Sequence, residues 1–347
     1  MAKSAIANLV GRPVTLLDVA RRAKVSKSTA SRALSVPGRV NEKTAARIHR
    51  AAEALNYVSH GVARALTTRR TRTIGAVIPT LDNAIYAISA HSMEQRLQKA
   101  GYMLFVACHE FDLDVETSAV EALISRGVDG IALVGLKHNR KTLALLARAR
   151  MPYVLTWNYQ NGRQPCVGFN NREAGFLIAD YLIRLGHRKF AVIAGITKGN
   201  DRAAARVAGI RDALEQSGIE LRDDHIVEKQ YSIEGGRDGL SAILSKKRGA
   251  TAVICGNDIL AIGAIYEARG RRIRVPADIS ITGFDDMPLA AVSEPSLTTV
   301  HFPMAEVGLN AAVHLLNALG VSNEVPKSEL PVHLIVRNSA ASPRKPA

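Results

Sequence analysis

One sequence feature limits the possible folds more than any other. From Ile74 almost to the end of the chain, short apolar runs alternate with longer helical stretches. The apolar runs predict strands at 73–79, 102–108, 130–135, 152–157, 190–195, 251–256 and 279–284. The helical stretches between most of them have about ten to fifteen residues and often end at a glycine, as at Gly101, Gly186, Gly218 and Gly270. This order predicts an α/β fold with parallel sheets that helices cover on both faces. Ligands of such folds bind beyond the carboxyl ends of the strands.

Motifs of enzymes and of cofactor sites are missing from this α/β region. The sequence contains no G-x-G-x-x-G, G-x-x-x-x-G-K-[ST] or G-x-S-x-G, which disfavours a dinucleotide site, an ATP site and a hydrolase nucleophile. Cys108, Cys166 and Cys255 lie far apart, and the ten histidines lack H-E-x-x-H spacing. We therefore expect no disulfide framework, no metal, no cofactor and no enzymatic activity.

Signals for membranes and secretion are weak. No apolar run approaches the ~18 to 20 residues that span a bilayer. The N-terminal stretch MAKSAIANLVGRP has one lysine and a broken apolar segment, which is a poor secretory signal. The expected location is the cytoplasm.

The positive charge of the chain is concentrated at its N-terminal end. Residues 1–72 carry 15 of the 46 Lys and Arg side chains but only 3 of the 31 Asp and Glu side chains. Most of the formal net charge of +15 therefore comes from this segment. A local excess of this size is typical of a domain that binds a polyanion such as nucleic acid.

The basic segment has the pattern of a folded domain. Residues 15–57 predict three short helices, each preceded by a good N-cap: Thr15, which has an acidic residue three positions later, Ser26 and Asn41. Pro37 and the following glycine end the second helix. A disordered basic tail would not carry caps and apolar stripes at these positions.

The second of these helices, in the stretch VSKSTASRAL, has one polar face. At ~100° per residue, Lys27, Ser28, Ser31 and Arg32 fall within an arc of about 140°. Small apolar residues occupy much of the remaining surface and can pack on the first helix. Long cationic donors can reach guanine acceptors, and hydroxyls can bond bases or phosphates. This face predicts a recognition helix for the major groove of DNA.

The stretch VTLLDVARRAKVSKSTASRAL, residues 14–34, resembles the helix-turn-helix of the lactose-repressor (LacI) family of bacterial transcription regulators. The resemblance implies an all-α DNA-binding domain at 14–57. It implies that Lys27, Ser28 and Arg32 read bases. It also implies that four hydroxyl residues touch the DNA backbone, namely Thr15, Ser26, Thr29 and Ser31.

The next stretch, NYVSHGVARALTTRRTRTIG, continues the resemblance. It implies a hinge helix and linker at 58–72 that folds on DNA and inserts Leu66 into the minor groove, with Ala63 one turn earlier. An apolar wedge of this kind kinks DNA. Gly61 and the threonines after Leu66 weaken the helix in isolation, which suits folding on binding. The arginines that follow contact phosphates or simply face solvent.

The α/β region resembles the periplasmic-binding-protein-like effector domain of the same family. Stretches that carry this resemblance include IPTLDNAIYA, VGFNNREAG, ARVAGIRDAL, GNDILAIGA and RVPADISITGFDD. The resemblance implies a two-lobed domain at 73–340 that clasps a small molecule. Its lobes are expected at about 74–170 and 171–300, with later segments crossing back. With the DNA-binding end, the resemblance covers nearly all of 14–338.

The resemblance implies an effector site at the strand ends. Arg and Asp in one cleft suit a polyhydroxylated or anionic ligand, because both make directional hydrogen bonds to hydroxyls or carboxylates. Trp157 could stack on a sugar face or pack in the hinge; the family commonly has an acidic residue nearby, so no ligand identity is carried over. The expected effector-binding residues are Tyr86, Trp157, Arg206, Tyr231, Asn257 and Asp285.

These features together predict a DNA-binding transcriptional regulator, in particular a repressor, that works on DNA in the nucleoid. Its affinity for a near-palindromic operator would be controlled by a small effector, in particular a sugar or sugar acid, acting as inducer or corepressor. The C-terminal end lacks leucine heptads, which favours a homodimer over a tetramer. One competing hypothesis is a sugar-binding transport receptor, which would need a signal peptide. Another is a sugar-modifying enzyme with a fused DNA-binding end, which would need a phosphate loop or a paired acid and base.

Overall fold

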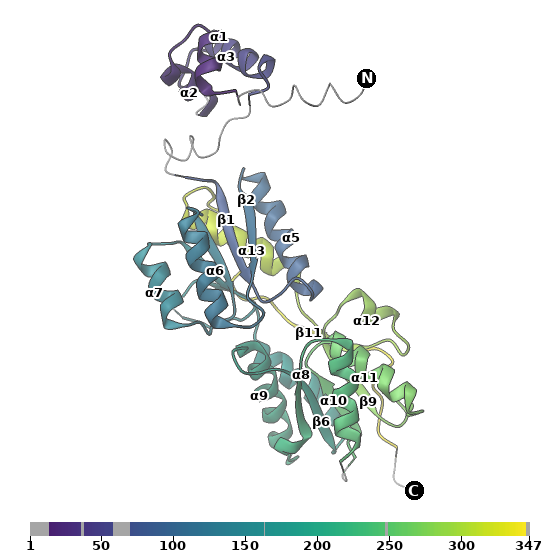
Figure 1. Cartoon of the computed structure of the whole chain (residues 1–347). Coiled ribbons are helices and arrows are strands. Elements are labelled where there is room, and N and C mark those ends of the chain that lie inside the picture. Colours follow the sequence, from purple (N-terminus) through teal and green to yellow (C-terminus); the bar gives the residue numbers. More distant parts are fainter. Residues whose placement is uncertain (1–13, 36–37, 58–69, 163, 247–248, 345–347) are drawn as a thin grey trace, which may run out of the picture. The chain divides into compact units, whose positions relative to one another are not determined.

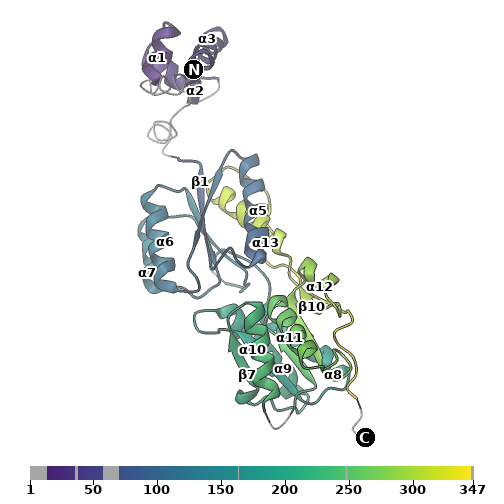
Figure 2. The same cartoon turned by 45° about the vertical axis from the view of Figure 1, so that its right-hand side comes forward.

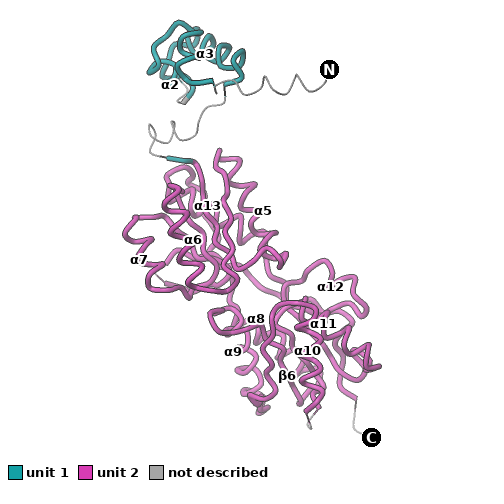
Figure 3. The backbone as a smooth tube through the Cα atoms, viewed as in Figure 1, with its two compact units in different colours: residues 1–71 teal, residues 72–347 magenta. Residues whose placement is uncertain are grey.

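The computed structural model describes residues 14–35, 38–162, 164–246 and 249–344, apart from 58–69, and divides the chain into two compact units. Residues 1–71 belong to the first unit and 72–347 to the second (Figure 3). The first unit is helical, and the second contains two α/β lobes, each built on a sheet of mainly parallel strands (Figure 1). The predicted fold class, a helix-turn-helix followed by a two-lobed α/β domain, is confirmed.

Three helices form the first unit, and the predicted caps begin them. The backbone N–H of Thr15 donates to the Asp18 carboxylate at 2.9 Å, and Asn41 accepts from Lys43 at 3.0 Å. Small side chains in the core let the helices approach closely, with Ile48 completely buried among buried alanines. The helices are α1 (Leu16–Arg22), α2 (Lys27–Ser35) and α3 (Glu42–Ala54).

The first lobe of the second unit is built on a five-stranded parallel sheet. Its strand order is β2-β1-β3-β4-β5. Helices α6 and α7 cover one face, and α5 and the late helix α13 pack together on the other (Figures 1 and 2). The strands are β1 (Thr73–Ile78), β2 (Met103–Cys108), β3 (Gly130–Val134), β4 (Tyr153–Thr156) and β5 (Cys166–Val167). The helices are α5 (Ala84–Lys99), α6 (Leu113–Ser125), α7 (Arg140–Arg148) and α13 (Met304–Ala318).

The second lobe contains a six-stranded sheet of order β11-β10-β9-β8-β6-β7, parallel except for β11. Alternate residues of strand β6, which lies between β8 and β7, face two different cores, one shared with α8 and α9 and the other with α10 and α11. The strands are β6 (Phe190–Gly195), β7 (Ile226–Lys229), β8 (Ala252–Cys255), β9 (Ser280–Asp285), β10 (Thr298–His301) and β11 (His333–Ile335). The helices are α8 (Asn171–Arg184), α9 (Asp201–Gln216), α10 (Ile233–Leu244), α11 (Asp258–Gly270), α12 (Pro288–Val292) and the short 3₁₀ turn η2 (Asp223–His225).

Segments far apart in the sequence cross between the lobes side by side. The chain leaves β5 for α8, returns after β10 to form α13, and crosses again to β11. Two of these crossings are joined where Gly168 donates to the carbonyl of Ser328 and accepts from the N–H of Leu330, at 2.9 and 2.8 Å. The crossings therefore form a short hydrogen-bonded hinge between the two sheets.

The predicted helix ends agree with the structure, but the number of strands differs. Gly101, Gly186 and Gly218 follow helices with φ of 74°, 99° and 66°, as expected of glycines that end helices. The predicted helix end at Gly270 is also confirmed, because Gly270 is the last residue of α11; the left-handed residue there is Arg272, with φ of 60°. The structure also adds four strands to the seven predicted, namely β5, β7, β10 and β11.

Candidate functional site

Helix α2 presents the polar face that its spacing predicts. Lys27, Ser28 and Arg32 are exposed, whereas Ala30 and Ala33 are buried in the small core of the first unit. Arg32 Nε donates to the carbonyl oxygen of Ser28 at 3.3 Å, so the guanidinium lies along the helix surface. Two cations and a hydroxyl thus share one solvent-facing surface, which is the chemistry that reads base edges and phosphates.

The hydroxyl residues expected at the DNA backbone lie around this helix. Ser26 is exposed, and its Oγ accepts from the backbone N–H of Thr29 at 3.1 Å, which begins α2. Thr15 and Ser31 are half-buried. Contact of all these side chains with DNA stays a prediction. Two further predicted residues, Ala63 and Leu66, lie outside the described residues.

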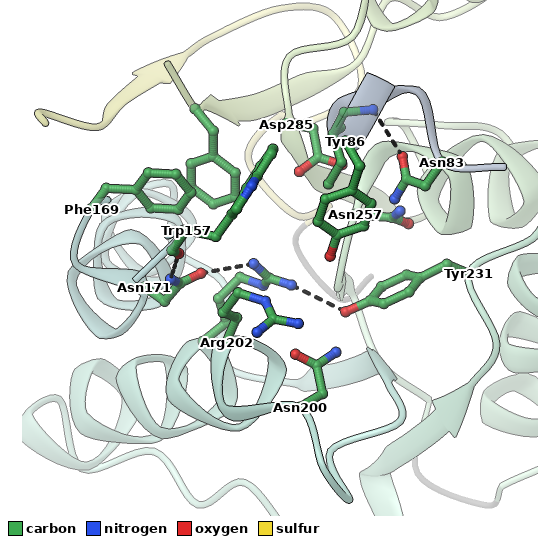
Figure 4. Close-up of a pocket in the computed structure, with 13 residues that line it drawn as sticks. Asn83, Tyr86, Trp157, Phe169, Asn171, Asn200, Arg202, Tyr231, Asn257 and Asp285 are labelled. Carbon is green, nitrogen blue, oxygen red and sulfur yellow. Dashed lines mark hydrogen bonds between the residues drawn. The ribbon is translucent and has the colours of Figure 1, made fainter. Parts of the chain in front are cut away.

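A cleft in the second unit brings together all six residues predicted for the effector (Figure 4). They come from both lobes: Tyr86 and Trp157 from the first, and the others from the second. The cavity between the side chains is only about 10 Å³, which is room for about one water molecule. The residues in question are Tyr86, Trp157, Arg206, Tyr231, Asn257 and Asp285.

Seven further side chains line the cleft, and the sequence patterns did not indicate them as site residues. Most lie on the interlobe crossings or at the first turn of a helix, where no periodic pattern points to a site. Arg202 is different, since it precedes Arg206 by one helical turn and the 3.6-residue period places both on one face of α9. The seven are Asn83, Ile85, Phe169, Asn171, Asn200, Arg202 and Phe302.

Aromatic rings form one wall of the cleft. The ring of Trp157 meets that of Tyr86 edge to face at a centroid distance of 5.0 Å, and Phe169 stacks on Phe302 at 4.2 Å. Trp157 has φ of 70°, and its carbonyl accepts from the amide of Asn171 at 2.9 Å. Burial raises the pKa of Tyr86, so this hydroxyl stays protonated. The wall offers a flat apolar surface with fixed orientation.

Arg206 lies in the cleft with uncharged partners. Its Nη1 donates to the amide oxygen of Asn171 at 2.8 Å, and its Nη2 donates to the hydroxyl of Tyr231 at 3.1 Å. The ring centroids of Phe284 and Phe302 lie 5.4 and 5.7 Å from its guanidinium carbon. Its Nε is buried and has no hydrogen-bond partner among the described residues.

Asp285 and Asn257 bring two further unpartnered atoms to the cleft. Asp285 ends β9 with φ of 113°, and only 2% of its surface is exposed. Burial raises its pKa well above the usual range, the nearby Asp258 adds to this, and Arg206 opposes it. Asn257 uses its side-chain oxygen to cap α11 through the N–H of Leu260 at 2.9 Å. Within the described segments, Asp285 Oδ2 and Asn257 Nδ2 have no partner.

Asp201 joins the two lobes beside this cleft. Its carboxylate lies 2.9 Å from Arg202 Nη1 within α9. The same carboxylate accepts from the N–H of Leu136 and from the amide of Asn158 in the first lobe, both at 2.9 Å. Burial alone would raise the pKa of Asp201, but the charge of Arg202 and these hydrogen bonds outweigh burial and lower it. An ionised carboxylate therefore joins the two lobes beside the cleft.

The parts of the chain that the structure describes contain no cluster of three or more His, Cys, Asp or Glu residues that could hold a metal ion. None of the described helices is both long and apolar enough to cross a membrane.

The chain is similar to known regulators over almost its whole length. Residues 15–60 match the family of bacterial regulatory proteins called lacI, and residues 179–340 match the periplasmic binding protein-like domain. Catabolite control protein A of Priestia megaterium is 31% identical over 329 residues, which cover 94% of this chain and 99% of that protein. The HTH-type transcriptional repressor PurR of Pasteurella multocida is 31% identical over 332 residues, with the same coverage.

Solved structures agree with these sequence matches. The lac repressor dimer bound to operator and the anti-inducer ONPF has a TM-score of 0.84 and 25% identity, covering 95% of this chain and 100% of that one. The CelR–cellobiose complex, also a transcriptional regulator, has a TM-score of 0.69 and 26% identity over the same share of each chain. The relatives are transcriptional regulators and not transport receptors or enzymes.

Proposed function

The chain belongs to the lacI family of bacterial regulatory proteins, and from this premise we propose which of its residues perform the two tasks of such a protein. It is a DNA-binding transcriptional repressor, and a small effector controls its affinity for DNA. We assign DNA recognition to 14–57, a hinge helix and linker to 58–72, and effector binding to 73–340. One observation carries the assignment: six residues expected at the effector site, drawn from both lobes, line a single cleft.

The exposed face of α2 is the proposed reading surface. Lys27, Ser28 and Arg32 would contact base edges in the major groove, where Arg and Lys pair with guanine. The surrounding hydroxyls would fix the position of the helix on the phosphates. In the linker, Leu66 would enter the minor groove with Ala63 beside it. The backbone contacts are assigned to Thr15, Ser26, Thr29 and Ser31.

The cleft is the proposed effector site, with a sugar or sugar acid as ligand. Tyr86 and Trp157 would contact the ligand from the first lobe. Arg206, Tyr231, Asn257 and Asp285 would contact it from the second. A ligand touching both lobes changes the balance between open and closed arrangements, and such a change can alter DNA affinity at the distant site. We propose binding without chemical turnover, in the cytoplasm where the nucleoid is accessible.

A second copy of the chain is the proposed partner, and a near-palindromic operator is the matching DNA. Two-fold symmetric dimers read two half-sites about one helical turn apart. The edge strand β2 leaves Met103, Phe105 and Val106 exposed, an apolar strip suited to an interface. We expect Phe105→Glu to shift dimer toward monomer in sedimentation equilibrium, while Val325→Glu, at a residue that is 94% exposed outside this strip, leaves the dimer intact. Equal dissociation of the two variants would place the interface elsewhere.

DNA selection with the full chain tests the proposed function. Purified protein should enrich a two-fold symmetric sequence from a random duplex pool, and one small molecule should change its affinity for that sequence without being consumed. Arg32→Ala should weaken binding to the selected site by about 1–3 kcal/mol and blur its sequence preference. A uniform loss on selected and scrambled DNA would limit Arg32 to phosphate contact. Absence of any sequence preference in the wild type would refute the function itself.

A further inference from the structure

Arg206 gives the cleft a positive charge that no described carboxylate neutralises. Ion-pair partners of the described arginines include many Asp and Glu side chains, but none of those is within 4.0 Å of Arg206. Its partners, the amide of Asn171 and the hydroxyl of Tyr231, are uncharged. A guanidinium removed from water without a counter-charge favours binding of an anion.

The other charged groups of the cleft do not offset Arg206. Arg202 is paired with Asp201, at 2.9 Å between Nη1 and Oδ1, so this pair adds no net charge. Asp285 is the one carboxyl among the residues that line the cleft; burial and the nearby Asp258 raise its pKa, Arg206 lowers it, and its carboxyl makes no ion pair with Arg206. Arg206 is therefore a charged group of the cleft that no described carboxylate pairs directly.

The remaining polar groups suit hydroxyls. Asn257 Nδ2 is a buried donor and Asp285 Oδ2 is a buried carboxyl oxygen, and both lack partners among the described residues. Figure 4 shows Asp285 and Asn257 on one side of the drawn side chains and Arg202 on the other. The cavity that the lining side chains enclose in this structure is only about 10 Å³, so a ligand can reach these groups only when the two lobes move apart.

We propose that the effector is a polyhydroxylated monocarboxylate, a sugar acid, whose carboxylate pairs with Arg206 while hydroxyls meet Asn257 and Asp285. This assignment rests on the proposed function of the cleft. A single carboxylate matches the one guanidinium that lacks an ion pair. A phosphate monoester carries about −1.5 to −2 charges at neutral pH and would exceed it. A neutral sugar could accept hydrogen bonds from the guanidinium but would bring it no counter-charge.

Isothermal titration of the full chain tests the proposed ligand class. The probes are the aldonic and uronic acids of glucose and galactose, the two parent sugars, and their 6-phosphates. At least one acid should bind about tenfold or more tightly than its parent sugar and its phosphate, because a charge-assisted bidentate bond replaces a neutral one. Arg206→Gln should abolish this preference for the acid, and Arg206→Lys should retain part of it. Arg184→Gln removes one exposed charge from α8, outside the cleft, and should leave the preference unchanged.

The outcomes separate the ligand class from the function. Equal or tighter binding of a neutral sugar or a phosphate, failure of all the acids to bind, or an acid preference that survives Arg206→Gln would overturn the assignment of a sugar acid. A second measurement tests the function separately: the affinity of the protein for the selected DNA is measured with and without each of the same compounds. A neutral sugar that alters DNA affinity would support the function and overturn the ligand class. An acid that binds the cleft without altering DNA affinity would support the ligand class and contradict the regulatory role.

Discussion

Buried polar atoms without partners gather at the cleft. Eight such side-chain atoms occur among the described residues, and three of them, Arg206 Nε, Asn257 Nδ2 and Asp285 Oδ2, belong to residues that line it. Each unmade hydrogen bond costs about 1–3 kcal/mol. A ligand that supplies the missing partners recovers part of this cost, so these side chains favour binding at the expense of stability in the free protein.

The stability that the protein loses by burying Asp285 can be measured as a dependence of the free energy of unfolding on pH. Its raised pKa, and the pKa of about 7 that burial produces at Asp258, mean that the folded protein holds protons that the unfolded chain releases near pH 4. The free energy of unfolding must then fall as pH rises between the unfolded and folded pKa values, by about 1.4 kcal/mol per pH unit for each proton. We expect Asp285→Asn to lose less stability than the wild type between pH 5 and pH 8 in urea titrations.

Asp278→Asn is the matched control for this prediction. Asp278 has its pKa lowered to about 2, chiefly by the hydrogen bond from Arg274, so it does not titrate between pH 5 and pH 8. Its variant should keep the pH slope of the wild type. Identical slopes for wild type and Asp285→Asn would show that Asp285 is ionised in the folded protein throughout this range.

At the scale of elements, the contact between α8 and α9 sets the position of Arg206. Gly209 faces the carbonyl oxygen of Arg172, and Gly175 faces that of Arg206, so the two helices touch backbone to backbone. A Cβ at Gly209 would overlap that carbonyl, and α9 would have to move away. We expect Gly209→Ala to lower the free energy of unfolding by about 1–3 kcal/mol. It should also weaken effector binding about tenfold while leaving effector-free DNA binding nearly unchanged. Urea unfolding and isothermal titration measure these effects.

Gly270→Ala controls for the loss of a glycine. No atom lies within 4 Å of a Cβ placed there, and its φ is outside the left-handed region. Alanine should therefore be neutral or stabilise the helix by up to about 1 kcal/mol. If Gly270 instead had a left-handed backbone, alanine would cost about 1–2 kcal/mol.

The same elements show how far the sequence alone reaches. Long apolar runs predict β1, β6 and β9 because their residues are buried on both faces. Strands such as β7 and β10 have only four residues with polar positions among them, and they are strands because a neighbour fixes their register. Local patterns do not encode such long-range pairing.

The candidate site divides in the same way. Its strand-end and motif residues could be predicted, as Asp285 and Arg206 illustrate. The stacked rings of Phe169 and Phe302 could not, since they lie 4.2 Å apart only because two distant crossings run through the hinge. Asn171 was missed for a related reason, because it becomes a site residue only through its bonds to Arg206 and the Trp157 carbonyl.

At the scale of the whole molecule, effector and DNA act on the same chain through the first lobe. Its strand β1 begins at Thr73, directly after the proposed linker. Asp201 ties this lobe to the second one through Leu136 and Asn158. We propose that a ligand that favours one arrangement of the lobes acts on DNA binding through the start of β1, to which the linker is joined in the chain. Thermodynamic linkage requires that DNA change effector affinity by the same factor as the effector changes DNA affinity.

Leu66 tests whether this coupling passes through the linker. Inserting a leucine from each subunit between base steps unstacks them at a cost of a few kcal/mol per step, and the bent DNA offsets that cost through added contacts. Leu66→Ala should preserve folding and the effector affinity of the free protein but sharply lower affinity for the selected DNA and reduce its bend. Non-specific binding, which rests on phosphate contacts, should change little. The preferred DNA should have an easily kinked pyrimidine–purine step at its centre.

Two measurements on the Leu66→Ala variant distinguish a wedge from a plain connection. Gel-mobility assays on permuted fragments report the bend, and effector titrations with and without DNA report the coupling factor. If Leu66 drives the hinge onto DNA, the bend and the coupling factor fall together, because the linker then no longer distinguishes the effector-bound from the effector-free protein. An unchanged bend with unchanged specific affinity would reduce 58–72 to a tether. In that case the effector would have to act by changing the spacing of the two recognition helices in the dimer, since that spacing alone would then determine whether both half-sites can be bound at once.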